Sequence, residues 1–113
     1  MKKHLTPLLL LLAFTSAHAV YNEQGIKTYQ KLCKECHGSE FRGAGMLTMD
    51  EWDEIYDKGD AEMAALHKES PKALEMLKEG YYQSRKDDLF DFLTNNAKDA
   101  GAVPGCDGNY CGY

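Results

Sequence analysis

The chain has 113 residues, of which 43% are hydrophobic, 27% are charged and 11% are aromatic, and its formal net charge is −5. This length is too short for two ordinary domains, and the composition excludes a disordered chain and a protein with several membrane spans. A chain this acidic should repel nucleic acid and anionic lipid, so we expect no nucleic acid among its partners.

Residues 1–19 have the pattern of a cleavable secretory signal peptide. Lys2 and Lys3 precede an apolar run over residues 8–14, and Ala17 and Ala19 are the small residues of a cleavage site. The apolar run is shorter than the roughly 20 residues that a spanning helix requires, and no lipid-attachment cysteine follows, so we expect no membrane anchor. Cleavage leaves about 94 residues with a charge near −7. We therefore predict a periplasmic protein.

Residues 20–100 are predicted to form one all-α domain of about four to five helices. β-Branched residues are scarce, which argues against strands, and the segments between turn residues have helical spacing. The expected helices run from Asn22 to Cys36, from Thr48 to Lys58, from Asp60 to His67, from Ser70-Pro71 to near Gly80, and from near Ser84 along an apolar stripe of Leu89, Phe92, Leu93 and Ala97.

Capping residues define where three of these helices should begin. Asn22 is an N-cap candidate, and Thr48 with Glu51 three residues later has the pattern of a capping box. Ser70 followed by Pro71 places a cap directly before a proline at the first helical position. These signals are local, so we expect the three boundaries to hold in the folded protein.

Cys33-Lys34-Glu35-Cys36-His37 is a C-x-x-C-H motif, the attachment signature of c-type haem. Two thiols at this spacing can form thioethers with the two vinyl groups on one porphyrin edge, and the following histidine then ligates the iron from one face. The motif predicts one covalently attached haem c, with Cys33 and Cys36 as attachment residues and His37 as the proximal ligand. Assembly outside the cytoplasm agrees with the predicted export.

Two other interpretations of the cysteines remain open from the sequence. Cys33 and Cys36 have the spacing of a redox dithiol, although no βαβ pattern surrounds them. They also have the spacing of half a zinc site that Cys106 and Cys111 would complete, although four residues separate that second pair. A Soret band would exclude both interpretations.

The chain resembles the class I cytochromes c. The resemblance depends on Gly25, Tyr29, the haem motif with the following Gly38, and the aromatic final helix around Phe90 and Phe92. It implies a small all-α fold around one haem and a role as an electron carrier. It also implies that Gly25 lets the last helix cross the first closely, with Tyr29 packing there against Phe92 or Phe90.

The distal iron ligand is where the sequence departs from that family, because no methionine adjoins a proline in an extended loop. Three residues are candidates. His67 is the only other imidazole after residue 19, and imidazole is a good iron ligand. Met76 has a spacing from His37 that suits the family, but it lies within a predicted helix where a core role is the alternative. Met63 follows a suitable turn but is close in sequence. We favour His67, and an open sixth position remains the fourth possibility.

Other residues near the motif have paired interpretations. Met46 and Met49 are expected to line the pocket. Trp52 and Tyr56 either line a haem crevice, with the indole N–H aimed at a propionate, or are ordinary core aromatics. Arg42 either pairs with a propionate or is a solvated loop residue.

A run of acidic residues in the second predicted helix bears on partners. It is most simply a solvated face, but around an exposed haem edge it would guide a basic redox partner. We expect redox protein partners with a basic docking face, and a monomeric protein. The run consists of Asp50, Glu51, Asp53, Glu54 and Asp57.

Residues 101–113 are predicted to form a tail in which Cys106 and Cys111 pair as a disulfide, because Asp-Gly and Asn between them favour a tight turn. The overall prediction is a periplasmic monohaem cytochrome c that carries single electrons and is not an enzyme. The alternatives are a haem sensor or peroxide-reducing enzyme with an open sixth iron position, and a haem subunit of a larger respiratory complex.

Overall fold

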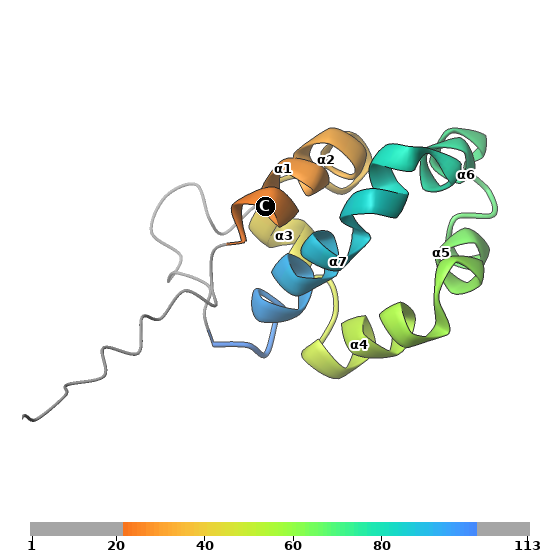
Figure 1. Cartoon of the computed structure of the whole chain (residues 1–113). Coiled ribbons are helices and arrows are strands. Elements are labelled where there is room, and N and C mark those ends of the chain that lie inside the picture. Colours follow the sequence, from red (N-terminus) through yellow and green to blue (C-terminus); the bar gives the residue numbers. More distant parts are fainter. Residues whose placement is uncertain (1–21, 102–113) are drawn as a thin grey trace, which may run out of the picture.

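The computed structural model describes residues 22–101, which form an all-α domain without strands in that part of the chain (Figure 1). The all-α part of the predicted fold class is confirmed. The predicted signal peptide and the Cys106–Cys111 disulfide lie outside the described residues. The helices in the described range are α1 (Glu23–Leu32), α2 (Lys34–His37), α3 (Glu40–Ala44), α4 (Met49–Lys58), α5 (Asp60–Leu66), α6 (Pro71–Lys78) and α7 (Gly80–Asn95).

The three predicted caps are all formed. The Asn22 side chain accepts a hydrogen bond from the Gly25 N–H at 2.9 Å. Thr48 and Glu51 make a complete capping box at the start of α4. Ser70 caps α6 through the N–H of residue 73, and Pro71 occupies the first turn. Because a side-chain cap satisfies backbone N–H groups that lack a helical partner, these residues specify the helix starts locally.

The prediction of four to five helices is wrong, since the described residues contain seven. The expected helix from Asn22 to Cys36 is divided at Cys33, which ends α1 and begins α2. A short helix, α3, occupies a glycine-rich stretch that had the signals of a turn. Helix α7 begins at Gly80 rather than near Ser84, directly after the cap of α6. These differences arise where tertiary contacts override weak local signals.

The contact between α1 and α7 is the most extensive between two helices in the described residues. A glycine makes this close approach possible. A Cβ atom on Gly25 would lie 2.2 Å from the Asp88 carbonyl oxygen and 2.6 Å from the Phe92 Cβ. Tyr29 meets Phe92 edge-to-face, with ring centroids 6.1 Å apart. The expected close crossing is therefore confirmed, and Phe92 is the aromatic residue that packs there.

The apolar stripe of α7 forms the centre of the core. Its predicted members Leu89, Phe92, Leu93 and Ala97 are all buried, as are Tyr29, Trp52 and Tyr82. Phe90 points to another side of α7 and contacts Trp52 at a centroid distance of 6.2 Å. Figure 1 shows α4, α5 and α6 following one another along an arc, with α7 running back across the domain. Within residues 22–101 no helix combines the length and apolar character needed to cross a membrane.

Candidate functional site

A cavity of about 470 Å³ brings the predicted site residues together. Its wall includes Cys33, Cys36 and His37 from the haem motif and His67 from the turn after α5. The volume falls within the range of about 300–1,000 Å³ that is usual for small-molecule and cofactor sites. The four residues proposed from the sequence thus line one cavity, although His67 is distant from the motif in the chain.

The remaining wall of the cavity is largely apolar. Helices α1, α4, α6 and α7 all contribute, so the cavity lies between the elements that form the core. Burial of an apolar group is favoured in such a site because it removes apolar surface from water. The main aliphatic residues are Leu32, Leu47, Ile55, Leu77, Leu89 and Leu93.

The rings of His37 and His67 lie close together in the wall of this cavity. Their ring centroids are 6.0 Å apart and their ring planes are inclined by 88°. Two imidazoles that ligate one metal from opposite sides, each with a metal–nitrogen bond of about 2.0–2.1 Å, hold their centroids roughly 6 Å apart. The observed separation is close to that value.

The electrostatic environment keeps His37 able to bind a metal. Burial lowers the pKa of His37 below its usual value, and the neighbouring His67 lowers it further. A lowered pKa favours the neutral imidazole near pH 7, and only the neutral form has a nitrogen lone pair for a metal.

A hydrogen bond orients the His67 ring. Its Nδ1 lies 2.7 Å from the Met63 carbonyl oxygen. Since a carbonyl oxygen can only accept, Nδ1 is the donor, and the neutral ring then has its lone pair on Nε2. Histidines that bind metals commonly donate their second nitrogen in this way.

Met63 and Met76, the competing candidates for the distal position, also line the cavity. The carbonyl of Met63 already orients His67, and its partly buried side chain packs against the core. Both Met46 and Met49 are exposed, but only Met46 lines the cavity as predicted. The Met49 N–H donates to Asp99 at 2.8 Å. The histidine pair has a separation that fits a shared metal, and this geometry favours His67.

The two motif cysteines differ in exposure. Cys33 is half-buried at the junction of α1 and α2, and burial raises the pKa of its thiol to about 12. Cys36 is exposed, and both thiols are free. Tyr29 fixes the end of the motif, since its hydroxyl donates to the Gly38 carbonyl at 2.9 Å. The motif is therefore anchored to α1 on the side of the cavity.

An ion pair lies at the edge of the cavity. Lys72 of α6 is 2.5 Å from Glu35 of the haem motif, and both residues line the cavity. Both side chains are largely exposed, so solvent screens the pair and its contribution to stability is small. It nevertheless joins the motif to the opposite wall.

For three supporting residues the structure gives surroundings other than the propionate contacts considered for them. Trp52 lines the cavity, but its indole N–H donates to the Ala44 carbonyl at 2.8 Å and is not aimed at a propionate. Tyr56 is on another face, where its hydroxyl donates to Asp87 at 2.6 Å. Arg42 is exposed and is not among the residues that line the cavity.

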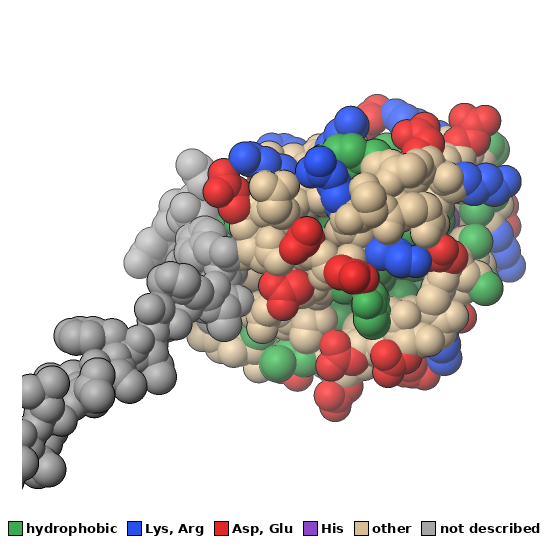
Figure 2. All heavy atoms as spheres, in the orientation of Figure 1, with side chains coloured by type: hydrophobic (Ala, Val, Ile, Leu, Met, Phe, Trp, Pro, Cys, Tyr) green, Lys and Arg blue, Asp and Glu red, His purple; other side chains and the backbone are tan. Residues whose placement is uncertain are grey.

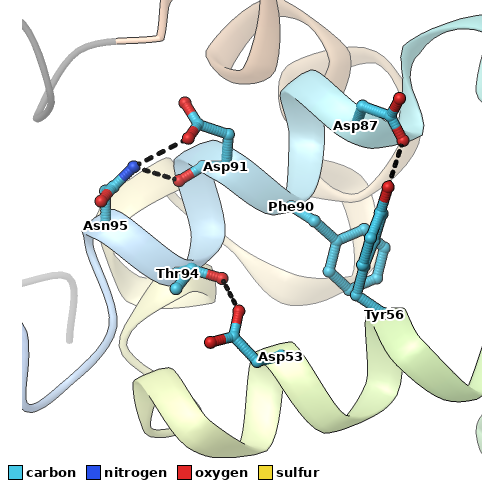
Figure 3. Close-up of a pocket in the computed structure, with 7 residues that line it drawn as sticks. All are labelled: Asp53, Tyr56, Asp87, Phe90, Asp91, Thr94 and Asn95. Atoms are coloured by element: carbon cyan, nitrogen blue, oxygen red, sulfur yellow. Dashed lines mark hydrogen bonds between the residues drawn. The ribbon is translucent and has the colours of Figure 1, made fainter.

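A separate acidic groove of about 210 Å³ lies between α4 and α7 (Figure 3). Neutral donors orient its carboxylates: Tyr56 donates to Asp87, and Asn95 donates to Asp91 at 3.0 Å. Of the acidic run in α4, Asp53 belongs to this groove. Sequence reasoning missed the contribution of α7, for which Asp87 and Asp91 at a spacing of four residues were the available signal.

Acidic and basic side chains are interspersed on the face of the molecule drawn in Figure 2.

Within residues 22–101 no group of three or more His, Cys, Asp or Glu side chains is arranged to hold a metal ion. An axial histidine pair does not need such a group, because a porphyrin supplies the other four ligands. The zinc alternative depends on Cys106 and Cys111, which are outside the described residues.

Comparisons with protein-family models, with curated proteins and with solved structures found no match.

Proposed function

We propose that this protein is a periplasmic monohaem c-type cytochrome that carries single electrons between redox partners. The observation that carries the proposal is the pairing of His37 and His67 at 6.0 Å in an apolar cavity whose wall also holds both motif cysteines. The close crossing at Gly25 and the Tyr29–Phe92 contact support the resemblance to class I cytochromes c. The distal histidine would distinguish this chain within that family.

Each part of the site has a role in this function. When bound, haem c supplies an iron that gains and loses one electron reversibly. Cys33 and Cys36 would hold the group covalently, and His37 and His67 would ligate the iron through neutral imidazole nitrogens. The apolar side chains exclude water from the site, which limits the reorganisation that accompanies a change of charge. With both axial positions occupied, electron transfer is favoured over binding of a gas or peroxide.

Replacing His67 with alanine tests the axial assignment. We expect the His67→Ala holoprotein to change from low-spin to a five-coordinate or water-ligated spectrum, with a higher reduction potential because a strong donor to ferric iron is lost. Met76→Ala is the matched control. It should keep the low-spin spectrum and cost about 2 kcal/mol of unfolding free energy, the low end for a methionine, because Met76 is only half-buried.

The visible spectra and redox titrations of the two variants decide between the ligands. If Met76→Ala abolishes the low-spin spectrum and His67→Ala retains it, the axial pair is histidine–methionine. A high-spin spectrum in the unmodified protein would favour the sensor or peroxide-reducing alternative.

The proposed partner is a redox protein with a basic docking face. The acidic groove presents three carboxylates to solvent, and its Phe90 contacts Trp52, a residue of the cavity wall. A docked partner at this groove would thus be one aromatic contact away from the cavity. Long-range attraction between opposite charges raises association rates and weakens as salt screens it.

We expect electron exchange with a basic partner to slow as ionic strength rises. A variant with Asp53→Asn and Asp91→Asn should weaken this salt dependence. The matched control, Glu75→Gln with Glu79→Gln, removes the same charge from exposed positions at α6 and should affect it less. Stopped-flow rates against one basic and one acidic partner provide the measurement. Equal salt dependence in both variants would mean that partners dock elsewhere.

A further inference from the structure

Two backbone hydrogen bonds and one hydrogen bond of the ring hold His67 in place. Its backbone N–H donates to the Ala64 carbonyl at 3.1 Å, and the Ser70 N–H donates to the His67 carbonyl at 2.9 Å. Its ring donates from Nδ1 to the Met63 carbonyl at 2.7 Å. Ser70 is itself the cap of α6, so the turn is joined to the helices on both sides. Both the position and the rotation of the ring are therefore determined by the protein.

This rotation places the His67 ring almost perpendicular to that of His37, at 88°. We propose that the Met63 carbonyl is a positioning group that holds His67 perpendicular to His37, so that the haem iron has crossed axial imidazole planes. The inference rests on the proposed function and goes beyond it, because it concerns the electronic state of the iron as well as the identity of its ligands.

Crossed ring planes have a specific electronic consequence. Each imidazole donates π-electron density perpendicular to its own plane, into one of two iron d orbitals that have similar energies. Parallel rings act on the same orbital and separate the two energies. Perpendicular rings act on different orbitals and leave the energies nearly equal. A low-spin ferric iron with nearly equal orbitals gives a highly anisotropic electron paramagnetic resonance (EPR) signal, dominated by one large g value.

The carbonyl bond should also affect the redox equilibrium. An imidazole that donates its Nδ1–H to a carbonyl gains basicity at Nε2 and becomes a stronger donor to the metal. A stronger donor favours ferric iron over ferrous iron and lowers the reduction potential. The same contact explains why Met63 lies beside the site without needing to be a ligand: its backbone orients the histidine, and its side chain packs against the core.

The first measurement is low-temperature EPR of the oxidised holoprotein with its natural sequence. We expect a single large-g feature. A rhombic signal with three resolved g values would indicate nearly parallel rings and would overturn this inference alone, leaving the proposed electron carrier intact. Absence of covalent haem would overturn the proposed function and this inference together.

The second measurement isolates the carbonyl bond. Replacing His67 with Nδ1-methylhistidine removes the donor and retains Nε2 as a ligand. We expect the holoprotein to remain low-spin, with a less anisotropic EPR signal and a higher potential. Leu74→Met is the matched control, because it has a similar volume and Leu74 is not among the residues that line the cavity, and both readouts should be unchanged. Met63→Leu keeps the carbonyl and removes the sulfur, so loss of the low-spin spectrum in this variant would make Met63 a ligand and overturn the inference. An unchanged signal and potential in the methylhistidine protein would also overturn it.

Discussion

A protein in which both Cys33 and Cys36 are replaced with serine is expected to retain no haem after extraction with acidified organic solvent. The two thiols line the cavity together with His37, and serine hydroxyls do not form the thioethers that would attach the proposed haem. Each single variant should keep one thioether and remain extractable only in part. Haem staining of the denatured protein after electrophoresis measures the result directly.

The matched control for this experiment is the replacement of Cys106 and Cys111 with serine. It removes the same number of cysteines but leaves the haem motif unchanged, so haem should stay covalently attached. The zinc alternative instead predicts that replacing Cys106 and Cys111 abolishes metal binding, since that site requires all four cysteines. Covalent haem in the Cys33–Cys36 double variant would contradict the attachment proposed here.

The variant in which both Cys33 and Cys36 are replaced with serine should also lose most of its helical structure. The cavity has a volume of about 470 Å³ and is bounded by side chains of the core, so an empty site would leave that core without its central contacts. In proteins whose binding site forms only on folding, the binding free energy contributes directly to folding, and a domain this small has little stability in reserve. Far-UV circular dichroism of the apo chain and of the holoprotein compares the two states.

Gly25→Ala is expected to destabilise the holoprotein severely. The added Cβ would lie 2.2 Å from the Asp88 carbonyl oxygen, which belongs to the α7 backbone and cannot rotate away as a side-chain end can. Helices α1 and α7 must therefore separate, which weakens the Tyr29–Phe92 contact and displaces a wall of the cavity. Overpacking of this kind costs about 1–3 kcal/mol, and backbone contact places Gly25 at or above the upper end.

Gly80→Ala is the matched control for this prediction. A Cβ on Gly80 would meet nothing within 4 Å, and this glycine also lies within α7. Alanine has the higher helix propensity, so this variant should be neutral or slightly stabilising. Urea unfolding of the two holoproteins gives the comparison, and equal midpoints would show that the helix crossing tolerates a side chain.

Much of the local structure was predictable because its signals lie within one helical turn. The caps at Asn22, Thr48 and Ser70 each satisfy a backbone N–H three residues away, and all three formed where expected. The apolar stripe of α7 was likewise readable from its spacing, because residues three and four apart share a helix face. The haem motif is of the same kind, since its chemistry depends on five consecutive residues.

Other local features were not predictable, because packing decided them. The break between α1 and α2 at Cys33 and the short helix α3 lie in a stretch where Tyr29 reaches the Gly38 carbonyl and where a Cβ on Gly43 would overlap the Tyr29 hydroxyl. Tyr29, which precedes the segment from Cys33 to α3, thus shapes it through contacts with Gly38 and Gly43. The choice of Phe92 over Phe90 at the helix crossing also followed from how α7 is rotated against its neighbours.

The sequence by itself determined the all-α class, the starts of α1, α4 and α6 and the C-x-x-C-H motif, because each depends on neighbours in the chain. Only the tertiary structure decided that His67 lies beside His37 in one cavity and which carboxylates share a groove. Those residues come from separate helices and turns, and no local pattern specifies how such elements meet. Their meeting depends on the burial of apolar faces around α7, a property of the whole domain.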